Sequence, residues 1–253
     1  MRPIITLLTD FGTADGYVAE MKGVILTRAP EAALVDVTHD VPPQDVECGR
    51  LALARYWRRF PPGTVHVAVV DPGVGTARAA LAVESDGRWL VGPDNGVLSP
   101  ALLVAGARAV TLPIPSTAAP TFHGRDVFAP AAAHLALGAA LDSLGSPALE
   151  LVVRRTPEPR RRPNGSIEGQ VITVDRFGNA ITNLLGLRAL SVEVNGTTLP
   201  VRRSYSDVAP GAPVAVVGST GLIEIAVRDG SGAAVLGLRR GSIVLAHNAK
   251  RES

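Results

Sequence analysis

The spacing of hydrophobic and polar positions differs between the two parts of the chain. Up to about residue 150, short apolar runs such as PIITLLTD, AALVDVT and TVHVAVVD alternate with runs of helical spacing, such as DGYVAEMKGVILTRA and the segment around 46–59. This alternation is typical of βαβ units, which build a mostly parallel sheet covered by helices. The sequence therefore predicts an N-terminal α/β/α domain over residues 1–152.

The second part is a series of short apolar runs without a long helical pattern. The runs cover residues 168–174, 191–202, 213–217, 222–228 and 242–247, and Gly, Asn, Asp and Ser separate them. Short strands divided by turn residues predict a smaller, barrel-like β domain over residues 166–253. The fold class is therefore α/β followed by β.

Residues 153–165 join the two predicted domains, and their composition is unusual. The surrounding stretch VVRRTPEPRRRPNGS contains three prolines and five arginines, namely Arg154, Arg155, Arg160, Arg161 and Arg162. A basic arm that binds nucleic acid is one interpretation. Because no aromatic residues are interleaved for base stacking, a solvated linker is the favoured interpretation and no nucleic-acid partner is expected.

Composition limits the class of protein. The chain has 253 residues, 46% of them hydrophobic, and no continuous apolar run of transmembrane length. It is therefore expected to be globular, without a membrane partner. The start MRPIITLLTDFG lacks the pattern of a secretory leader, so a cytoplasmic location is expected. The single cysteine, Cys48, is predicted to be a small buried apolar residue.

The predicted sheet suggests where chemistry occurs. In open α/β sheets ligands bind beyond the carboxyl ends of the strands. Asp10 ends the first apolar run, and a carboxylate there can accept both hydroxyls of a ribose. Asp15 precedes a predicted helix whose apolar stripe is Val18, Met21, Ile25 and Leu26. Asp15 is either a helix cap or a ligand contact.

Two further segments, VVDPGVGTAR and TFHGRDVFAP, carry polar residues at similar places. Pro72 and Gly73 predict a turn, but a turn requires neither Asp71 before it nor Arg78 after it. A phosphate loop is weakly indicated, since the Gly-Lys-Ser/Thr ending is absent. His123 considered alone is more often structural than catalytic. The other histidines, 39, 66, 134 and 247, lack metal-ligand spacing, so no metal is expected.

Seven segments, taken together and in order, carry a family resemblance. They are TDFGTADGYVAEMKG, DVTHDVPPQDV, VVDPGVGTAR, GPDNGVLSP, TFHGRDVFAP, DRFGNAITN and GSTGLIEIAV. They closely resemble the motifs of the S-adenosyl-L-methionine hydroxide adenosyltransferases, which are relatives of fluorinase and chlorinase. The resemblance implies an N-terminal α/β domain, a C-terminal β domain and a homotrimer with sites at subunit interfaces.

The activity implied by the resemblance is hydrolysis of S-adenosyl-L-methionine to adenosine and L-methionine, with water or hydroxide attacking C5′ of the ribose. S-adenosyl-L-methionine is the substrate, and no cofactor is implied. The implied catalytic residues are Asp71, Arg78 and His123. Arginine stays protonated and cannot be the base. Asp71 and His123 are both candidates to accept the proton of the water, and the sequence does not distinguish them.

Substrate contacts are also implied by motif position. Asp10 is expected on the ribose hydroxyls with Asp71 nearby, while Asp15 and Asp175 are expected near the methionine ammonium. The second domain would hold the adenosine through Asn179, Ser219, Glu224 and Val227. Without the resemblance, Asn179 and Ser219 are simply turn residues.

The same motifs separate hydrolase from halogenase. Halogenases of this kind have tyrosine where Asp71 stands, and an ionised carboxylate would repel a halide. Gln44 stands where the fluorinase has tryptophan. Arg228 departs from the small polar amide common in the family, which puts adenine contacts there in doubt. An adenosine or S-adenosyl-L-methionine binding module, with incidental hydrolysis, is an alternative.

Overall fold

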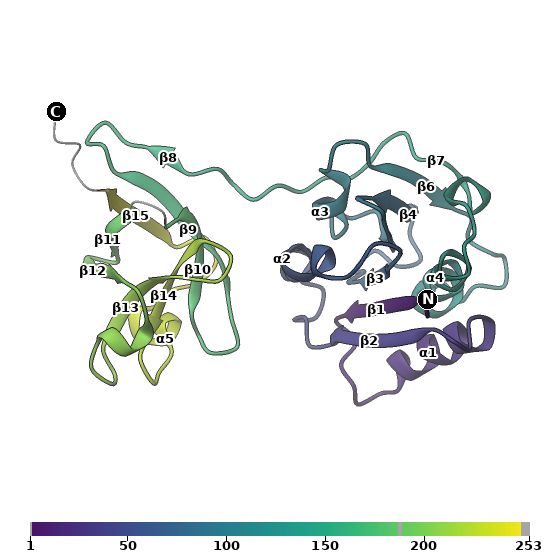
Figure 1. The fold of residues 1–253 in the computed structure, drawn as a ribbon, viewed down its shortest axis with the longest axis horizontal. Coiled ribbons are helices and arrows are strands. Elements are labelled where there is room, and N and C mark those ends of the chain that lie inside the picture. Colours follow the sequence, from purple (N-terminus) through teal and green to yellow (C-terminus); the bar gives the residue numbers. More distant parts are fainter. Residues whose placement is uncertain (1, 187–188, 249–253) are drawn as a thin grey trace. The chain divides into compact units, whose positions relative to one another are not determined.

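The chain forms two compact units. The computed structural model describes residues 2–186 and 189–248, and the boundary between the units lies after Arg155 (Figure 1). That boundary falls inside segment 153–165, which the sequence predicts to be the linker.

The first unit contains a seven-stranded sheet with the order β2-β1-β3-β5-β4-β6-β7. Its strands are β1 (Ile4–Thr9), β2 (Ala33–Thr38), β3 (Val65–Val69), β4 (Ala80–Ser85), β5 (Arg88–Pro93), β6 (Arg108–Leu112) and β7 (Ser146–Pro147). The four neighbours β2, β1, β3 and β5 are parallel, and β4, β6 and β7 extend the sheet in antiparallel pairs. The α/β prediction is confirmed.

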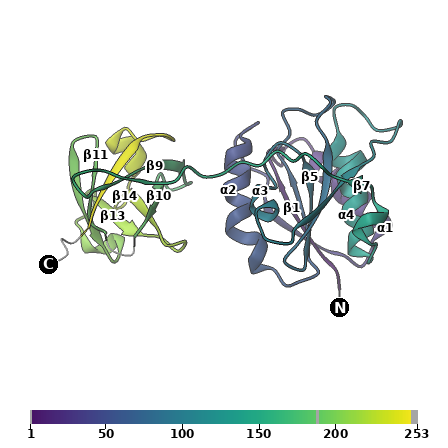
Figure 2. The ribbon, with the colours of Figure 1, turned by 90° about the horizontal axis from the view of Figure 1, so that it is seen from above.

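Helices cover both faces of this sheet (Figure 2). On one face lie α1 (Tyr17–Arg28) and α4 (Ala129–Ala136), and on the other lie α2 (Val46–Tyr56) and the short α3 (Ser99–Leu102). Single turns occur at Trp57–Arg59, Gly124–Phe128 and Leu141–Ser143. The chain passes from β1 through α1 to β2 and through α2 to β3, so β1 lies at the point where the strand order reverses. Ligand sites of open α/β sheets form beside such points.

The apolar stripe predicted on α1 is correct in part. Val18, Met21 and Ile25 are buried against the sheet, whereas Leu26 is 40% exposed, so its place in the stripe was wrong. Leu26 lies one position beyond Ile25, which turns it about 100° away from the sheet. Cys48 is half-buried and packs at the edge of the α2 core, so its prediction as a small buried apolar residue is correct only in part.

The second unit is a closed barrel of seven strands. They are β9 (Ile167–Val174), β10 (Ala180–Leu185), β11 (Ala189–Val194), β12 (Thr197–Arg202), β13 (Pro213–Val217), β14 (Leu222–Val227) and β15 (Ile243–Asn248). The pairing of β10 with β9 closes the sheet, and only β12 and β13 among the described pairs of this unit are parallel. The short α5 (Gly232–Leu236) packs against β14. The predicted barrel-like β domain is confirmed.

The arginine-rich segment makes contacts within each unit. In the first unit, Arg154 donates from its backbone N to Ser99 Oγ (2.8 Å) and from Nε to the carbonyl of Asn95 (2.9 Å). In the second unit, Arg160–Arg161 forms strand β8, which pairs with β9. Several of the arginines are therefore held by hydrogen bonds within their own unit. Within the described ranges, no helix is long and apolar enough to cross a membrane.

Candidate functional site

Three of the predicted site residues meet at the carboxyl ends of the parallel strands. Asp71 follows β3, Arg78 precedes β4, and His123 precedes the turn of π-helix at Gly124–Phe128. Arg78 Nε lies 3.0 Å from each carboxylate oxygen of Asp71, and Nη2 of the same guanidinium donates to Asp71 Oδ2. Nη2 also lies 2.9 Å from His123 Nδ1. Arg78 is therefore fixed between an acid and an imidazole.

This cluster is shielded from water. The side chains of Asp71 and Arg78 are 5% and 9% exposed, and His123 is buried as well. Burial lowers the pKa of His123 and the Arg78 guanidinium lowers it further, while the charges of Asp71 and Asp126 oppose the shift. Arg78 has donors only, so Nδ1 of the neutral imidazole accepts and Nε2 carries the proton.

One nitrogen of Arg78 stands out. Nη1 is buried and has no hydrogen-bond acceptor among the described residues. The Arg78 guanidinium carbon lies 5.4 Å from the centre of the Phe128 ring, so the cation also packs on an aromatic face. A buried donor without an acceptor is costly. It is suited to bind an oxygen that arrives with the substrate.

The turn between Asp71 and Arg78 is held tightly. Thr76 Oγ1 donates to the carbonyl of Gly73 (2.7 Å) and accepts from the backbone N of Arg78 (3.3 Å). Gly75 has a φ of 77°, and a Cβ built there would lie 2.6 Å from the carbonyl oxygen of Pro120. Gly75 therefore permits a close backbone approach. The approach joins the Asp71 turn to the segment that precedes His123.

A π-helical turn carries the residues after His123. Such turns are frequent at functional sites. Asp126, in this turn, accepts from the backbone N of Ala119 (2.8 Å) and from Arg125 Nε (2.7 Å). Arg125 also bonds Glu20 of α1 (2.8 Å). These contacts fix the turn to the segment before it and to α1.

Asp10 and Asp15 flank the loop between β1 and α1. Asp10 is half-buried, and its Oδ2 accepts from the backbone N of Gln44 (2.7 Å). Asp15 is exposed. The N-cap of α1 is Gly16, which has a φ of 76° and no capping side chain, so the alternative of Asp15 as the helix cap is wrong. A left-handed N-cap is a conformation that glycine adopts at no steric cost.

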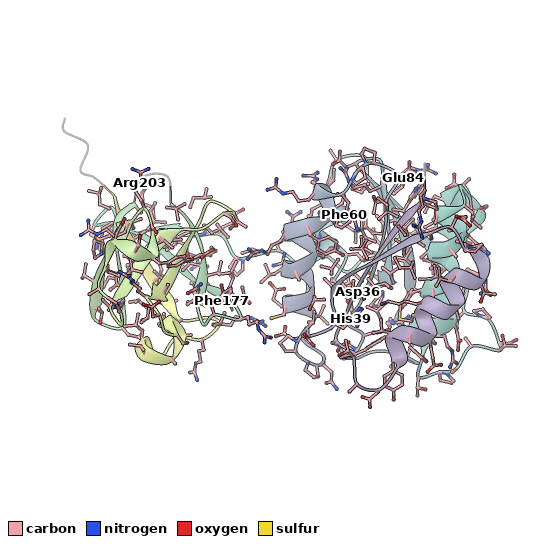
Figure 3. All side chains as sticks on the ribbon, turned by 60° about the horizontal axis from the view of Figure 1, so that its bottom comes forward. Asp36, His39, Phe60, Glu84, Phe177 and Arg203 are labelled. Atoms are coloured by element: carbon pink, nitrogen blue, oxygen red, sulfur yellow. The ribbon has the colours of Figure 1, made fainter. Side chains whose placement is uncertain are left out.

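In the barrel, Asp175 and Asn179 lie in the turn between β9 and β10, which also carries the exposed Phe177 (Figure 3). Asp175 Oδ1 accepts from the backbone N atoms of Phe177 and Asn179, both at 2.9 Å, and Oδ2 accepts from Asn179 Nδ2 at 3.0 Å. Asp175 therefore orients Asn179, whose amide nitrogen is engaged and whose amide oxygen remains an acceptor for a ligand.

Glu224 lies on β14 and is buried. Its Oε2 accepts from the hydroxyl of Tyr205 (3.0 Å), and its other oxygen lies against Gly218, where a Cβ would collide with it. Burial and the negative charges of Glu224 and Asp175 raise the pKa of Tyr205 to about 12, so the phenol stays a donor at neutral pH. Tyr205 belongs to a helical turn, Tyr205–Asp207, between β12 and β13.

The remaining barrel predictions lie farther apart. Ser219 is exposed in the turn before β14, whereas Val227 is the buried last residue of that strand. A strand rises about 3.3 Å per residue, so these two residues lie near opposite ends of β14. Arg228 donates from Nη1 to the carbonyl of Val208 (2.8 Å), which ties it to the segment after Tyr205.

Comparison with known proteins shows which family the chain belongs to. Two family models match the chain: the SAM hydroxide adenosyltransferase N-terminal domain over residues 5–145 and the C-terminal domain of the same family over residues 169–245. The chain belongs to the SAM hydroxide adenosyltransferase family. The predicted resemblance is thereby confirmed.

Individual relatives of this family agree over nearly the whole chain. A Thermus thermophilus protein named (R)-S-adenosyl-L-methionine hydrolase is 48% identical over 95% of this chain and 98% of its own length. A protein of Actinoplanes named fluorinase is 30% identical over 88% of this chain and 90% of its own length. A solved structure of a Thermotoga maritima protein matches with a TM-score of 0.86 and 33% identity, covering 96% of this chain and 99% of that one.

Sequence reasoning about this member of the family missed two supporting residues. Asn95 donates from Nδ2 to the carbonyl of Val70 (2.8 Å), the residue before Asp71, and accepts from the backbone N of Val97 (3.1 Å). Tyr205 holds Glu224 as described above. The GPDNG motif was a signal for Asn95, since Asn beside Gly at a strand end often bonds nearby backbone. No signal in the sequence pointed to Tyr205.

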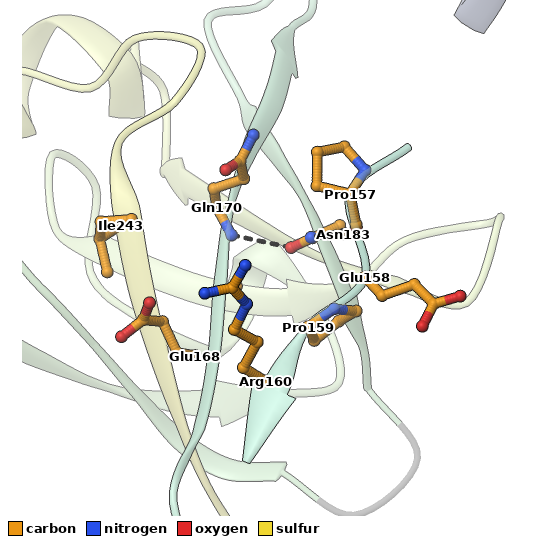
Figure 4. A pocket seen from close by; sticks show the side chains of 9 residues that line it. Pro157, Glu158, Pro159, Arg160, Glu168, Gln170, Asn183 and Ile243 are labelled. Atoms are coloured by element: carbon orange, nitrogen blue, oxygen red, sulfur yellow. Dashed lines mark hydrogen bonds between the residues drawn. The ribbon is translucent and has the colours of Figure 1, made fainter. Parts of the chain in front are cut away.

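An open cavity of about 600 Å³ lies elsewhere, beside β8 and β9 of the barrel (Figure 4). Arg160, Glu168, Gln170 and Asn183 line it, and Asn183 accepts from the backbone N of Gln170 (2.7 Å). It contains none of the predicted site residues. Across the described parts of the chain, no three His, Cys, Asp or Glu side chains are grouped so that they could hold a metal ion.

Proposed function

We propose that the protein is a cytoplasmic enzyme that hydrolyses S-adenosyl-L-methionine to adenosine and L-methionine. The observation that carries this proposal is the fixed position of Arg78 between Asp71 and His123, with the buried donor Nη1 left for the attacking oxygen. The hydrolase name of the 48% identical relative supports the same reaction.

The reaction that we propose is one displacement at carbon. The oxygen of water bonds to C5′ of the ribose while the bond from C5′ to sulfur breaks, and the electron pair leaves with methionine as a neutral thioether. A neutral leaving group needs no general acid. Arg78 Nη1 and His123 Nε2–H are donors that orient the water and stabilise the developing hydroxide. No metal or cofactor has a role in this proposal.

We propose that Asp71 accepts the proton that the attacking water loses. Nδ1 of His123 already accepts from Arg78 and Nε2 carries a proton, so the neutral imidazole has no lone pair left for the water. A carboxylate has about four acceptor sites, and the contacts with Arg78 occupy three of those of Asp71. Asp71 then releases the proton to solvent.

The substrate contacts that we propose keep the motif assignments. Asp10 takes the ribose hydroxyls, and its orientation by the backbone of Gln44 supports this role. Asn179, Ser219, Glu224 and Val227 hold the adenosine, while Asp15 and Asp175 attract the methionine ammonium. Asp175 has fewer acceptor sites left for the ammonium group, because its oxygens already accept from the backbone and side chain of its own turn.

We also propose a homotrimer, in which the first unit of one subunit and the barrel of the next supply the two halves of each site. The resemblance carries this proposal. Mixing inactive Asp71→Asn subunits with inactive Glu224→Ala subunits after mild dissociation tests it. Activity should return in the mixture, because some sites combine two intact halves. Two variants that remain inactive when mixed, although subunit exchange is observed, would contradict shared sites.

The reaction itself is tested by incubating the protein with S-adenosyl-L-methionine in ¹⁸O-labelled water, with and without chloride. Adenosine labelled at its 5′ oxygen, and no such product with Asp71→Asn, is the expected result. A chlorinated nucleoside would identify a halogenase. Tight binding of S-adenosyl-L-methionine without any product would instead identify a binding module.

A further inference from the structure

Two residues to which no chemical role has been given, Thr9 and His39, meet at the end of β1. Thr9, the last residue of β1, is fully buried, and its Oγ1 lies 2.8 Å from Nδ1 of His39, which follows β2. The same hydroxyl oxygen accepts from the backbone N of Phe11 (3.2 Å). The side chain of His39 thus reaches, through Thr9, the residues on both sides of Asp10.

The backbone after β2 holds the same loop from two further points. The carbonyl of His39 accepts from the backbone N of Gly12 (2.8 Å), and the backbone N of Gln44 donates to Asp10 Oδ2 (2.7 Å). Gln44 adopts a φ of 65°, which is uncommon for a residue other than glycine. Strain of this kind persists where surrounding contacts enforce it. Segment 39–44 therefore holds segment 9–12 on both sides of the Asp10 carboxylate.

A chain of polar groups holds the ring of His39 in place. Nε2 of His39 lies 3.0 Å from Asp36 Oδ1, and Lys22 Nζ lies 2.6 Å from Asp36 Oδ2 (Figure 3 labels Asp36 and His39). Burial would raise the pKa of Asp36, but the hydrogen bonds from Lys22 and His39 outweigh it and the pKa is lowered. An ionised Asp36 requires a proton on Nε2 of His39, and Nδ1 is the ring nitrogen that bonds the hydroxyl of Thr9.

We propose that His39, acting through Thr9, is a positioning residue for Asp10 and sets the affinity of the site for the ribose of its substrate. This inference rests on the proposed function, which gives Asp10 the ribose hydroxyls. A carboxylate binds two neighbouring hydroxyls well only in one orientation. Phe11 packs against the core of the first unit, but residues 12–16 are half-buried or exposed, so apolar packing holds the loop on one side of Asp10 only. The contacts of Thr9 and His39 supply the constraint.

The chain offers a matched control on the same strand. Thr6 of β1 is fully buried, and its Oγ1 lies 2.8 Å from Nδ1 of His66, which is fully buried too. The two Thr–His pairs thus have the same length and burial. In the described structure, however, the hydroxyl of Thr6 bonds His66 and Tyr56, and Thr6 lies three residues from the end of the strand. Thr6→Val removes the same kind of bond without touching the Asp10 loop.

The experiment measures KM and kcat for S-adenosyl-L-methionine, and the Kd of adenosine by calorimetry, for Thr9→Val, Thr9→Ser and Thr6→Val. Thr9→Val should raise KM and the adenosine Kd about five- to tenfold, the effect of one lost hydrogen bond of about 1–1.4 kcal/mol, with kcat nearly unchanged. Thr9→Ser keeps the hydroxyl and should resemble the wild type. Thr6→Val should lower the melting temperature but leave KM and Kd at the wild-type values.

Equal KM and Kd values in Thr9→Val and Thr6→Val would overturn the inference. If the wild type hydrolyses nothing but binds adenosine, the proposed function fails while the Kd values still decide the inference. If Thr9→Val does not fold, His39→Asn and His39→Ala replace it. Asn places an amide where Nδ1 stood. The KM and Kd of His39→Asn should therefore lie closer to the wild-type values than those of His39→Ala. The reverse order would contradict the role of His39.

Discussion

Arg78 Nη2 lies 2.9 Å from His123 Nδ1, and this contact decides which nitrogen of the ring carries the proton. Arginine donates at any ordinary pH, so Nδ1 accepts and Nε2–H points elsewhere. Since Asp71 holds Arg78 through both carboxylate oxygens, the acid sets the tautomer of the ring indirectly, through Arg78. The three residues therefore act as a unit.

The pH dependence of activity follows from this contact. Burial and Arg78 lower the pKa of His123 below its usual value of 6.5, so the ring stays neutral into mildly acidic solution. A protonated Nδ1 would face Arg78 with a second donor, so kcat/KM should fall with acid at a midpoint below 6.5. Measuring kcat/KM against pH, with His123 followed by NMR, checks this. A midpoint above 6.5 would contradict it.

The same shift affects stability with a definite sign. The unfolded chain binds a proton at about pH 6.5, whereas folded His123 binds it only at lower pH. The free energy of unfolding should therefore decrease as pH falls from about 6.5 towards the folded pKa, and this decrease should be smaller in His123→Gln.

The same variant gives a prediction for kcat. Gln retains a donor near the place of Nε2, so the kcat of His123→Gln should exceed that of His123→Ala, for which a loss of about 10²–10³ is expected.

The close approach at Gly75 gives a prediction with an internal control. Gly75 and Gly106 have φ angles of 77° and 80°, but only the Cβ of an alanine at position 75 would meet backbone, the carbonyl oxygen of Pro120. Both Ala variants should lose about 1–2 kcal/mol of stability from the left-handed conformation. Gly75→Ala should lose more and should also lower kcat, because the clash displaces the turn from Asp71 to Arg78. Thermal melts and kcat at a temperature where both variants are folded measure the difference. Equal losses in the two variants would show that the close approach does not support the site.

The hydroxyl of Tyr205 gives a prediction for the adenosine contacts that we propose in the barrel. Tyr205→Phe keeps the ring but removes the donor to Glu224. The buried carboxylate then lacks this partner, and KM should rise about five- to tenfold while kcat changes little. Tyr56→Phe is a control, because the Tyr56 hydroxyl faces Thr6, away from the predicted contacts. A KM that rises equally in both variants would assign the effect to general stability.

The period of the hydrophobic pattern predicted both folds because each unit buries one face of its strands and helices. Strand β10 was not predicted, because its sequence AITNLL contains Thr182 and Asn183, two polar residues that are usually exposed to solvent. Both are buried because their side chains find backbone partners: Thr182 donates to the carbonyl of Ile223 (2.8 Å) and Asn183 to that of Pro157 (2.7 Å). Such long-range partners have no local signature. Run 191–202 likewise divides into two strands at Asn195, which has a φ of 46°.

The site was predictable only as a set of motifs. Spacing placed Asp71 at a strand end, but nothing in the spacing brings His123 to Arg78, because 45 residues separate them in sequence. The resemblance supplied that pairing. It did not supply the residues that hold the site in shape, such as Asn95 and His39. Asn95 bonds the carbonyl of Val70 and His39 bonds the hydroxyl of Thr9, and only the folded chain brings these partners near.

Asn95 provides the last test. Its amide donates to the carbonyl of Val70, the residue between the end of β3 and Asp71, and accepts from the backbone N of Val97. Asn183 makes the same pair of bonds in the barrel, to the carbonyl of Pro157 and from the backbone N of Gln170. Each Ala variant leaves backbone groups unpaired and should lose about 1–3 kcal/mol of stability. Only Asn95→Ala should also lower kcat, because the end of β3 can then shift and the carboxylate of Asp71 with it. An unchanged kcat in Asn95→Ala, or an equal loss of kcat in Asn183→Ala, would contradict a role of Asn95 in holding Asp71.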